Sequence, residues 1–334
     1  MSIELPTAHI IGTGSMVPER ILSNKDLESI VDTSDEWIRR RTGISERRIS
    51  STTRDEGTSA MAIESSLRAM DMAGVNAPEF DMIVVGTVTQ DRMFPSAACS
   101  IQEAIGAKNA AAFDVSAGCC GFLYALSVVN NAIHCGTCKT ALVVGVERLS
   151  SVINWRDRGT CVLLADGGGA AVVSSGKNDG GILSTHIKSD GSLWELLYSA
   201  KGNDFRPEIL SDMDQKPSHL RMEGNRLFKK AIEFLTTISR KAMEKNSLSS
   251  DDISIVIPHQ ANIRIIQGMS KYLNIPMERI YVNLDRYGNT SSGTIPIALD
   301  EANRKGLIKK GDNVLLTAFG AGLTWASSIV KWSI

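Results

Sequence analysis

The chain has 334 residues, of which 43% are hydrophobic and 22% charged, and its formal net charge is -1. This apolar content supplies a core and excludes a disordered or fibrous chain, and the length fits about two domains of roughly 150 residues or one large α/β body. The balanced charge argues against a dedicated nucleic-acid-binding protein. We find no apolar run of the length of a membrane span and no signal-peptide pattern at the start. We therefore expect a cytoplasmic protein with neither nucleic acid nor membrane as a partner.

Short runs rich in Val and Ile alternate with longer helical patterns along the chain. The runs typical of buried strands are 81–86, 111–115, 141–145, 253–257, 281–284 and 314–316. The segments typical of helices are 61–74, 121–134 and 225–245. This alternation predicts an α/β fold with mostly parallel, buried sheets covered by helices.

A weak internal repeat suggests two similar halves. A helix, an acidic turn and a buried strand follow one another at 60–85 and again at 227–257. Each half also ends in a small-residue turn that runs into a strand, at 166–173 and 320–327. We expect an N-terminal half at 1–176 and a C-terminal half at 177–334, with chance similarity of two βαβ units as the alternative.

Cys119 is the candidate nucleophile. It lies between the predicted strand 111–115 and a predicted helix that begins at Gly121. A thiol at such a turn is near the positive end of the helix dipole, which stabilises the thiolate and lowers the thiol pKa. Nearby backbone N–H groups can stabilise an oxyanion. The alternative is that this Cys is only a small buried residue.

A cysteine nucleophile generally works with a histidine that the fold brings close. His259 directly follows the buried strand 253–257, and ligand sites in open α/β sheets gather at the carboxyl ends of strands. His134 is expected to be an ordinary helix-terminal residue. Asn289 is a second candidate because it follows the predicted strand 281–284, although an Asn there is usually a turn residue.

Two other patterns suggest different classes of protein. The segment 12–17 begins like a dinucleotide-binding loop but lacks glycine at its sixth position, and Pro18 follows where a helix should begin. Cys135 and Cys138 form a CxxC, but no second ligand pair has zinc spacing, and this pair ends a helix where a redox CxxC would start one. An NAD-binding oxidoreductase and a zinc or thiol-redox protein are therefore remote alternatives.

The sequence resembles the β-ketoacyl-acyl-carrier-protein synthase III family of the thiolase superfamily, whose members start bacterial type II fatty acid synthesis. The resemblance covers essentially the whole chain. It is carried by motifs in the family's order, at 32–38 with 41–44, 94–99, 113–119, 157–160, 222–225, 258–264, 288–291 and 318–322.

The resemblance implies a thiolase-like fold in which two similar α/β halves form a layered α-β-α-β-α body. It also implies a decarboxylative Claisen condensation. An acyl-CoA primer would acylate Cys119, and malonyl-acyl-carrier protein would lose CO₂ and attack the acyl-enzyme, giving 3-oxoacyl-acyl-carrier protein. His259 and Asn289 would donate to the malonyl thioester oxygen, and backbone N–H groups at Cys119 and Ala321 would hold the oxyanion. Such chemistry needs no metal and no redox cofactor.

Further positions follow from the same resemblance. A CoA tunnel, in which an indole stacks on adenine and arginines bind phosphates, is expected at Trp37, Arg41, Arg158, Met222, Asn225, Phe228 and Asn262. The acidic carrier protein is expected to dock on a basic patch at Lys229, Arg264 and Lys271. Phe94 matches a residue that crosses a dimer interface to close the partner's acyl pocket, which implies a homodimer. Before Pro95, a packed loop anchor explains Phe94 equally well.

Other members of the superfamily remain as alternatives. They are a synthase that loads an unusual starter in a natural-product pathway, a polyketide synthase of the chalcone type, and hydroxymethylglutaryl-CoA synthase. The Trp37 and Arg41 motif favours the fatty-acid enzyme, and Asn289 disfavours the elongating type with two histidines. Cys120 stands where the family usually has Ala or Ser, and it should not replace Cys119 because adjacent helix positions do not share a face.

Overall fold

The computed structural model describes residues 5–51, 56–176, 180–199 and 219–334. Its strands are β1 (Thr7–Met16), β2 (Ile21–Ser23), β3 (Glu46–Arg48), β4 (Met82–Gly86), β5 (Ala111–Val115), β6 (Thr140–Arg148), β7 (Asp166–Gly176), β8 (Gly181–Ser189), β9 (Leu197–Ser199), β10 (Leu220–Met222), β11 (Ile255–Pro258), β12 (Asn313–Gly320) and β13 (Thr324–Lys331). Its α-helices are α1 (Asn24–Glu28), α2 (Asp35–Thr42), α3 (Thr58–Ala73), α4 (Ala97–Ile105), α5 (Gly121–His134), α6 (Arg158–Cys161), α7 (Gly224–Lys245), α8 (Ile263–Leu273), α9 (Leu284–Tyr287) and α10 (Thr294–Arg304).

The two main sheets repeat one topology. The first has five strands in the order β1-β7-β6-β4-β5, and the second has four in the order β11-β12-β13-β8. In the first sheet β7 is antiparallel to β1 and to β6, and β6 is parallel to β4. In the second sheet β13 is antiparallel to β8 and to β12, and β12 is parallel to β11. Strand for strand, β8-β13-β12-β11 therefore matches β1-β7-β6-β4.

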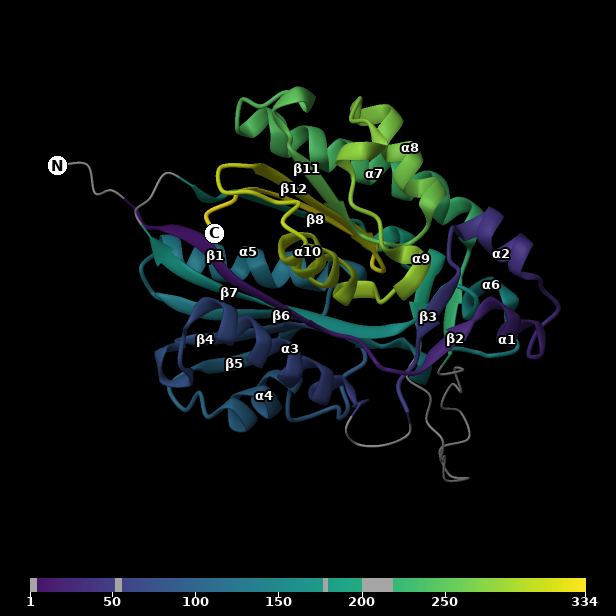
Figure 1. Cartoon of the computed structure of the whole chain (residues 1–334), viewed down its shortest axis with the longest axis horizontal. Helices are drawn as coiled ribbons and strands as arrows, with labels where there is room; N and C mark the ends of the chain where they lie inside the picture. The colour runs from purple at the N-terminus through teal and green to yellow at the C-terminus, as the bar shows by residue number, and fades with distance from the viewer. Residues whose placement is uncertain (1–4, 52–55, 177–179, 200–218) are drawn as a thin grey trace.

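The sheets and helices form five layers. In Figure 1, α5 and α10 lie between the two sheets, α3 and α4 cover the outer face of the first sheet, and α7 and α8 cover the outer face of the second. The apolar side of α5 supplies Phe122, Leu126 and Val129 to a core that also contains residues of both sheets and of α10. This arrangement confirms the expected layered α-β-α-β-α body. None of the helices in the described residues is long and apolar enough to cross a lipid bilayer.

The prediction of mostly parallel sheets was wrong. Only β4 with its two neighbours and β11 with β12 are parallel pairs in the main sheets, while β1, β7, β13 and β8 run antiparallel to their neighbours. The reason is that β7 and β13 return beside the preceding strand without a crossover helix packed across the sheet. The first four residues of the expected turn 166–173 also belong to β7, where Gly168 and Gly169 allow close packing on β6 and α10.

The predicted strand at 281–284 was also wrong. The only ladder contact there is an isolated bridge between Val256 and Ile280, and α9 begins at Leu284. The side-chain amide of Gln260 takes the place of a neighbouring strand. Its Nε2 donates to the Tyr281 carbonyl oxygen at 3.0 Å, and its Oε1 accepts from the Asn283 N–H at 3.2 Å.

Backbone groups meet without intervening side chains at the N-terminal end of α5. A Cβ on Gly86, the last residue of β4, would lie 2.2 Å from the carbonyl carbon of Gly121. A Cβ on Gly145 of β6 would lie 2.3 Å from the carbonyl oxygen of Ser292, in the short 3₁₀ helix η9 (Ser291–Gly293). These close approaches hold the start of α5 against β4, β6 and η9. They therefore also position Cys119 and Cys120, which directly precede α5.

We predict that Gly86→Ala destabilises the protein by about 1–3 kcal/mol, because the added methyl group has no space against Gly121. Thermal unfolding measures the effect. Gly191→Ala is the matched control, since a Cβ at Gly191 would meet no atom within 4 Å. An unfolding temperature of Gly86→Ala equal to that of the control would show that α5 is not held by this contact.

Candidate active site

One large cavity, of about 710 Å³, is lined by residues from distant parts of the chain, from Trp37 to Ala321. Cys119, His259 and Asn289 all line it, although they come from three separate parts of the chain. Aliphatic side chains line much of the rest, including Leu149, Leu163, Leu164, Leu197 and Leu220. An apolar cavity with a few convergent polar groups is the usual form of a small-molecule site.

Cys119 lies in the 3₁₀ helix η3 (Gly118–Cys120), directly before α5. The end of β12 packs tightly against it, because a Cβ on Gly320, the last residue of that strand, would lie 2.5 Å from the Cys119 nitrogen. The backbone N–H groups of Cys119 and Ala321 and the hydroxyl of Ser291 lie around the sulfur, where they would stabilise its thiolate form. Both backbone donors expected for an oxyanion therefore lie beside the reacting atom.

The expected fall in the Cys119 pKa is contradicted. Burial, with a smaller contribution from the charge of Glu147, raises the pKa of the thiol to about 11, and the nearby Ser291 hydroxyl and backbone N–H groups only reduce the shift. Desolvation of a thiolate outweighs a helix start of this kind when the sulfur is enclosed. Cys119 is therefore a protonated thiol at neutral pH. Cys120 is fully buried, and burial raises the pKa of its thiol as well.

His259 follows β11, and its backbone N–H continues the ladder by donating to the Thr317 carbonyl oxygen at 2.8 Å. Burial lowers the pKa of the imidazole to about 3, so the ring is neutral. Nδ1 lies 2.7 Å from the Thr294 hydroxyl oxygen, which is also 2.9 Å from the Ser291 carbonyl oxygen. The hydroxyl has one proton. When it donates to Nδ1, the ring proton is on Nε2, and when it donates to Ser291, the ring proton is on Nδ1.

Asn289 is held by its backbone and oriented by its side chain. Its N–H donates to the Leu163 carbonyl oxygen, and its carbonyl oxygen accepts from the Ala165 N–H, both at 2.9 Å. Its Oδ1 accepts from the Ser291 N–H at 2.8 Å. Because the oxygen of the amide is engaged, the NH₂ group is the part that can serve a ligand as a donor.

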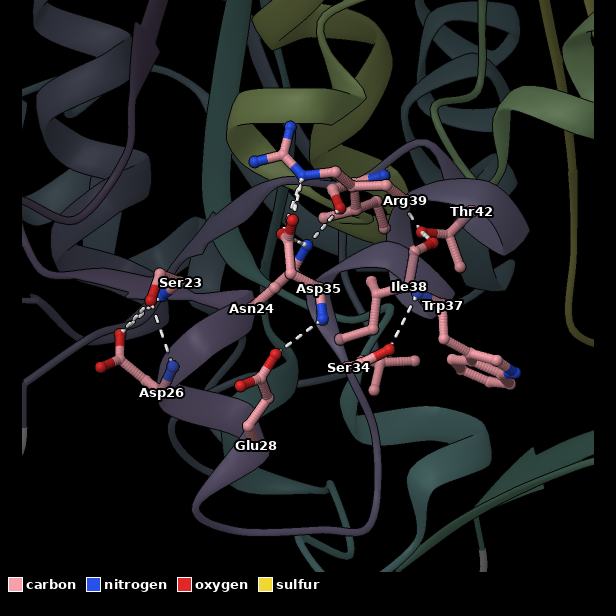
Figure 2. Close-up of polar contacts among 12 residues, drawn as sticks. Ser23, Asn24, Asp26, Glu28, Ser34, Asp35, Trp37, Ile38, Arg39 and Thr42 are labelled. Carbon is pink, nitrogen blue, oxygen red and sulfur yellow. Dashed lines mark hydrogen bonds and ion pairs between the residues drawn. The ribbon is translucent and has the colours of Figure 1, made fainter.

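Three of the expected CoA residues gather at one rim of the cavity. Figure 2 shows α2, where the Ser34 hydroxyl caps the helix by accepting from the Trp37 N–H and the Trp37 ring projects away from α1. The guanidinium carbon of Arg158 lies 4.8 Å from the centre of the Trp37 ring, and that of Arg41 lies 6.0 Å from it. Trp37 and Arg41 line the cavity, whereas Arg158 stands beside it and covers one face of the indole.

The other expected CoA residues also line the cavity: Met222, Asn225, Phe228 and Asn262. The side chain of Asn262 already has structural partners. Its Nδ2 donates to the Arg41 carbonyl oxygen at 3.0 Å, and its Oδ1 caps α8 by accepting from the Arg264 N–H. Asn262 therefore joins α2 to α8 and shapes the cavity wall.

The expected carrier-docking residues separate into two places. Lys229 and Arg264 line the large cavity, and the Arg264 guanidinium lies over the Phe228 ring at 5.6 Å. Lys271, further along α8, lies in a second, open groove with Arg240 and Tyr272. Phe94 does not line the large cavity, and 80% of its surface is exposed.

Three residues around the site escaped the sequence prediction, namely Thr294, Ser291 and Glu147. Ser291 lies in the motif at 288–291, and its position two residues after Asn289 could have indicated that it belongs to the site. Glu147 could have been noticed as an acid at the end of an otherwise apolar strand. Nothing in the sequence marks Thr294, because its contact with His259 joins residues far apart in the chain.

The cysteine pair that suggested a metal or redox site follows the end of α5. Cys135 is exposed, Cys138 is buried, and both are free thiols. Across the described ranges there is no group of three or more His, Cys, Asp or Glu residues placed to hold a metal ion.

Comparison with known proteins identifies the family. Models of 3-oxoacyl-[acyl-carrier-protein] synthase III match residues 113–191, and models of its C-terminal part match residues 243–332. The β-ketoacyl-[acyl-carrier-protein] synthase III of Caldanaerobacter subterraneus is 49% identical over 326 residues, which are 98% of this chain and 98% of that protein.

Solved structures agree with the sequence relatives. The 3-oxoacyl-[acyl-carrier-protein] synthase III of Aquifex aeolicus superposes with a TM-score of 0.90 at 43% identity, covering 97% of this chain and 100% of that one. The priming β-ketosynthase of the R1128 polyketide biosynthetic pathway superposes with a TM-score of 0.90 at 35% identity, covering 99% and 98%. With almost half of its residues shared over nearly its full length and one cavity lined by Cys119, His259 and Asn289, the chain belongs to the β-ketoacyl-acyl-carrier-protein synthase III family.

Proposed function

We propose that this protein is the acyltransferase that condenses an acyl-CoA primer with malonyl-acyl-carrier protein to start type II fatty acid synthesis. The observation that carries the proposal is the convergence of a thiol, a neutral imidazole and an oriented amide on one apolar cavity. Cys119, His259 and Asn289 are the proposed catalytic residues. The named activity of the relatives supports the same reaction.

In the first half-reaction, the Cys119 sulfur attacks the thioester carbonyl of the primer and CoA leaves as a thiol. The negative charge that develops on the carbonyl oxygen is held by the backbone N–H groups of Cys119 and Ala321. Their position beside the sulfur supports this role, because the oxygen of a carbonyl bonded to that sulfur would lie close to them.

In the second half-reaction, malonyl-carrier protein enters and its thioester oxygen receives hydrogen bonds from His259 Nε2 and Asn289 Nδ2. Loss of CO₂ places negative charge on that oxygen, so these donors act most strongly in the transition state. The carbon nucleophile attacks the acyl group, the Cys119 thiolate leaves, and 3-oxoacyl-carrier protein is the product. Each step uses side chains and backbone alone, and we propose no metal or redox cofactor.

The substrate contacts follow from the cavity. The Trp37 indole and the Arg41 guanidinium would bind the adenine and phosphates of CoA. Arg158, which lies over the indole, would be the second arginine at this end of the cavity. The pantetheine arm would lie along the cavity wall formed by Met222, Asn225, Phe228 and Asn262. The acidic carrier protein would dock on Lys229, Arg264 and Lys271.

We also propose a homodimer that uses the open edge of the first sheet. The edge strand β5 exposes Phe113, and the preceding segment exposes Met93 (69%) and Phe94 (80%). Unpaired strand edges and grouped apolar side chains mark association surfaces. In such a dimer Phe94 would reach the acyl pocket of the partner.

Two further proposals concern the chain as a whole. The repeated sheets support a division into halves at 1–176 and 177–334, although residues 177–179 lie outside the described part of the chain. We also propose a cytoplasmic location, which the carrier-protein substrate of this reaction supports.

A second candidate is a ketosynthase that loads an unusual starter in a natural-product pathway. The observation in its favour is the superposition on the priming β-ketosynthase of a polyketide pathway. The two candidates share every step at Cys119, His259 and Asn289, and they differ in the primer and carrier protein used. A panel of acyl-CoA primers with fatty-acid and polyketide carrier proteins separates them.

We predict that Cys119→Ala abolishes acylation, whereas Cys120→Ala largely preserves it because the Cys120 side chain is fully buried beside the cavity. Intact-mass spectrometry after incubation with an acyl-CoA primer shows the added acyl group. An acyl adduct on Cys119→Ala would overturn the nucleophile assignment.

We predict that Arg264→Glu raises the apparent KM for malonyl-carrier protein about tenfold, because a like charge would then face the acidic carrier. The KM for the CoA primer should change much less. Lys310→Glu is the control. Lys310 is exposed and precedes the start of β12, at the end of that strand that lies away from the cavity. Equal losses for both substrates in Arg264→Glu would contradict a docking role.

We predict that Thr294→Val slows malonyl decarboxylation, by up to the 10²–10³ typical of a lost oxyanion donor, because Nδ1 of His259 loses the hydroxyl that orients the ring. Acylation by the primer should persist in this variant. Thr294→Ser keeps the hydroxyl and should behave like the wild type. Decarboxylation at the wild-type rate in Thr294→Val would mean that the ring needs no such partner.

A further inference from the structure

Behind Cys119 lies a buried carboxyl group that the proposed reaction leaves without a task. Glu147, near the end of β6, has no exposed surface. Its oxygens accept from the hydroxyls of Thr87 and Thr89 and from the Val88 N–H on one side. On the other side they accept from the hydroxyls of Ser291 and Ser292 in η9. No lysine or arginine in the described parts of the chain forms an ion pair with it.

Ser291 stands between this carboxyl group and the reacting sulfur. Its hydroxyl donates to Glu147 Oε1 at 3.4 Å, and Ser291 and Cys119 lie next to each other in the cavity wall. A hydroxyl can accept one proton while it donates another. The hydroxyl is therefore placed between the thiol and the carboxylate, and its long bond to the carboxylate is of the kind that tightens when a substrate is bound.

We propose that Glu147, acting through the Ser291 hydroxyl, receives the proton of the Cys119 thiol while the sulfur attacks the acyl-CoA primer. The S–H proton passes to Ser291 Oγ, and the Ser291 hydroxyl proton passes to Glu147 Oε1. The sulfur forms its bond to the acyl carbon, and the bond from that carbon to the CoA sulfur breaks. The departing CoA thiolate takes up one proton, which Glu147 returns through the same hydroxyl. The proposal rests on the acyl-transfer function proposed above.

The protonation of the surrounding groups favours Glu147 over His259 as the acceptor. Burial raises the pKa of Glu147 to about 7, with the bonds from Thr89 and Val88 acting against the shift. The pKa of His259 is lowered to about 3, which makes its imidazole the much weaker base. A base whose pKa lies near the working pH is the most effective proton acceptor.

The other charged groups next to Glu147 are engaged elsewhere. Arg148, the next residue of β6, donates to the Ser51 carbonyl oxygen at 3.1 Å. Asp166, which lies opposite Arg148 on β7, accepts from Ser50 and from Ser150. From η9 the facing groups are the hydroxyls of Ser291 and Ser292, and from η3 the facing titratable group is the Cys119 thiol. The proton path therefore leads from the sulfur to Glu147.

The test is the rate of acylation in a single turnover, followed by intact mass between pH 5.5 and 9, in the full-length protein. In the wild type we expect an inflection near pH 7, because Glu147 must be ionised to accept a proton. In Glu147→Gln and Ser291→Ala we expect this inflection to vanish and the rate at pH 7 to fall about 10²-fold, the lower range for lost acid–base catalysis.

Ser292→Ala is the matched control, because Ser292 also donates to Glu147 but lies off the path to the sulfur. It should keep the inflection. If Glu147 acted only through its negative charge, which raises the thiol pKa, then Glu147→Gln would acylate faster than the wild type at pH 7. That result, or an unchanged profile in Ser291→Ala, would overturn the relay.

A second readout separates this proposal from the proposed function. Iodoacetamide alkylation of Cys119, followed by peptide mass analysis, needs no acyl-CoA. An inflection near pH 7 in the wild type that is lost in Glu147→Gln supports coupling of the two groups even in a protein that acyl-CoA does not acylate. Its absence in a wild-type protein that does accept an acyl group would refute the coupling and leave the acyltransferase function standing.

Discussion

The contact on which the site depends is the meeting of bare backbone around the start of α5. Gly86 packs on Gly121, Gly145 packs on Ser292, and Gly320 packs on Cys119, at distances that leave no room for a Cβ. Gly86 and Gly145 belong to the first sheet and Gly320 belongs to the second. Both sheets therefore pack closely around the segment from Cys119 to the start of α5. The sulfur is thereby placed beside groups that the distant segments at Ala321 and Ser291 supply.

The same close packing sets the protonation of the site. Burial raises the pKa of Cys119 and of Glu147 and lowers the pKa of His259, so each group is shifted towards its neutral form. A resting thiol and a neutral imidazole suit an enzyme that must first become acylated and then stabilise an enolate. The thiol then needs a proton acceptor only at the moment of attack, and neutral His259 is a hydrogen-bond donor through Nε2 when the Thr294 hydroxyl donates to Nδ1.

Local patterns predicted the parts of this site that are made locally. Cys119 between a strand and a helix, and His259 after a buried strand, were both expected from short segments and both line the cavity. The prediction of a strand at 281–284 was wrong because the side chain of Gln260 forms the hydrogen bonds that a neighbouring strand would form with this backbone. The periodicity of the sequence does not reveal such a contact. The prediction of a lowered pKa for the Cys119 thiol was wrong because burial of the sulfur depends on the tertiary structure. The contacts of Glu147, Ser291 and Thr294 join distant segments and became visible only in the folded chain.

The central claim is that one cavity carries both half-reactions, acylation at Cys119 and decarboxylative attack guided by His259 and Asn289. The most direct measurement is the mass of the carrier protein after the enzyme, an acyl-CoA primer and malonyl-carrier protein are combined. We expect the malonyl group to be replaced by a 3-oxoacyl group, with release of one CO₂ and one CoA for each product. Malonyl-carrier protein that stays intact, or that loses CO₂ without gaining the primer, in the presence of acylated enzyme would contradict the claim.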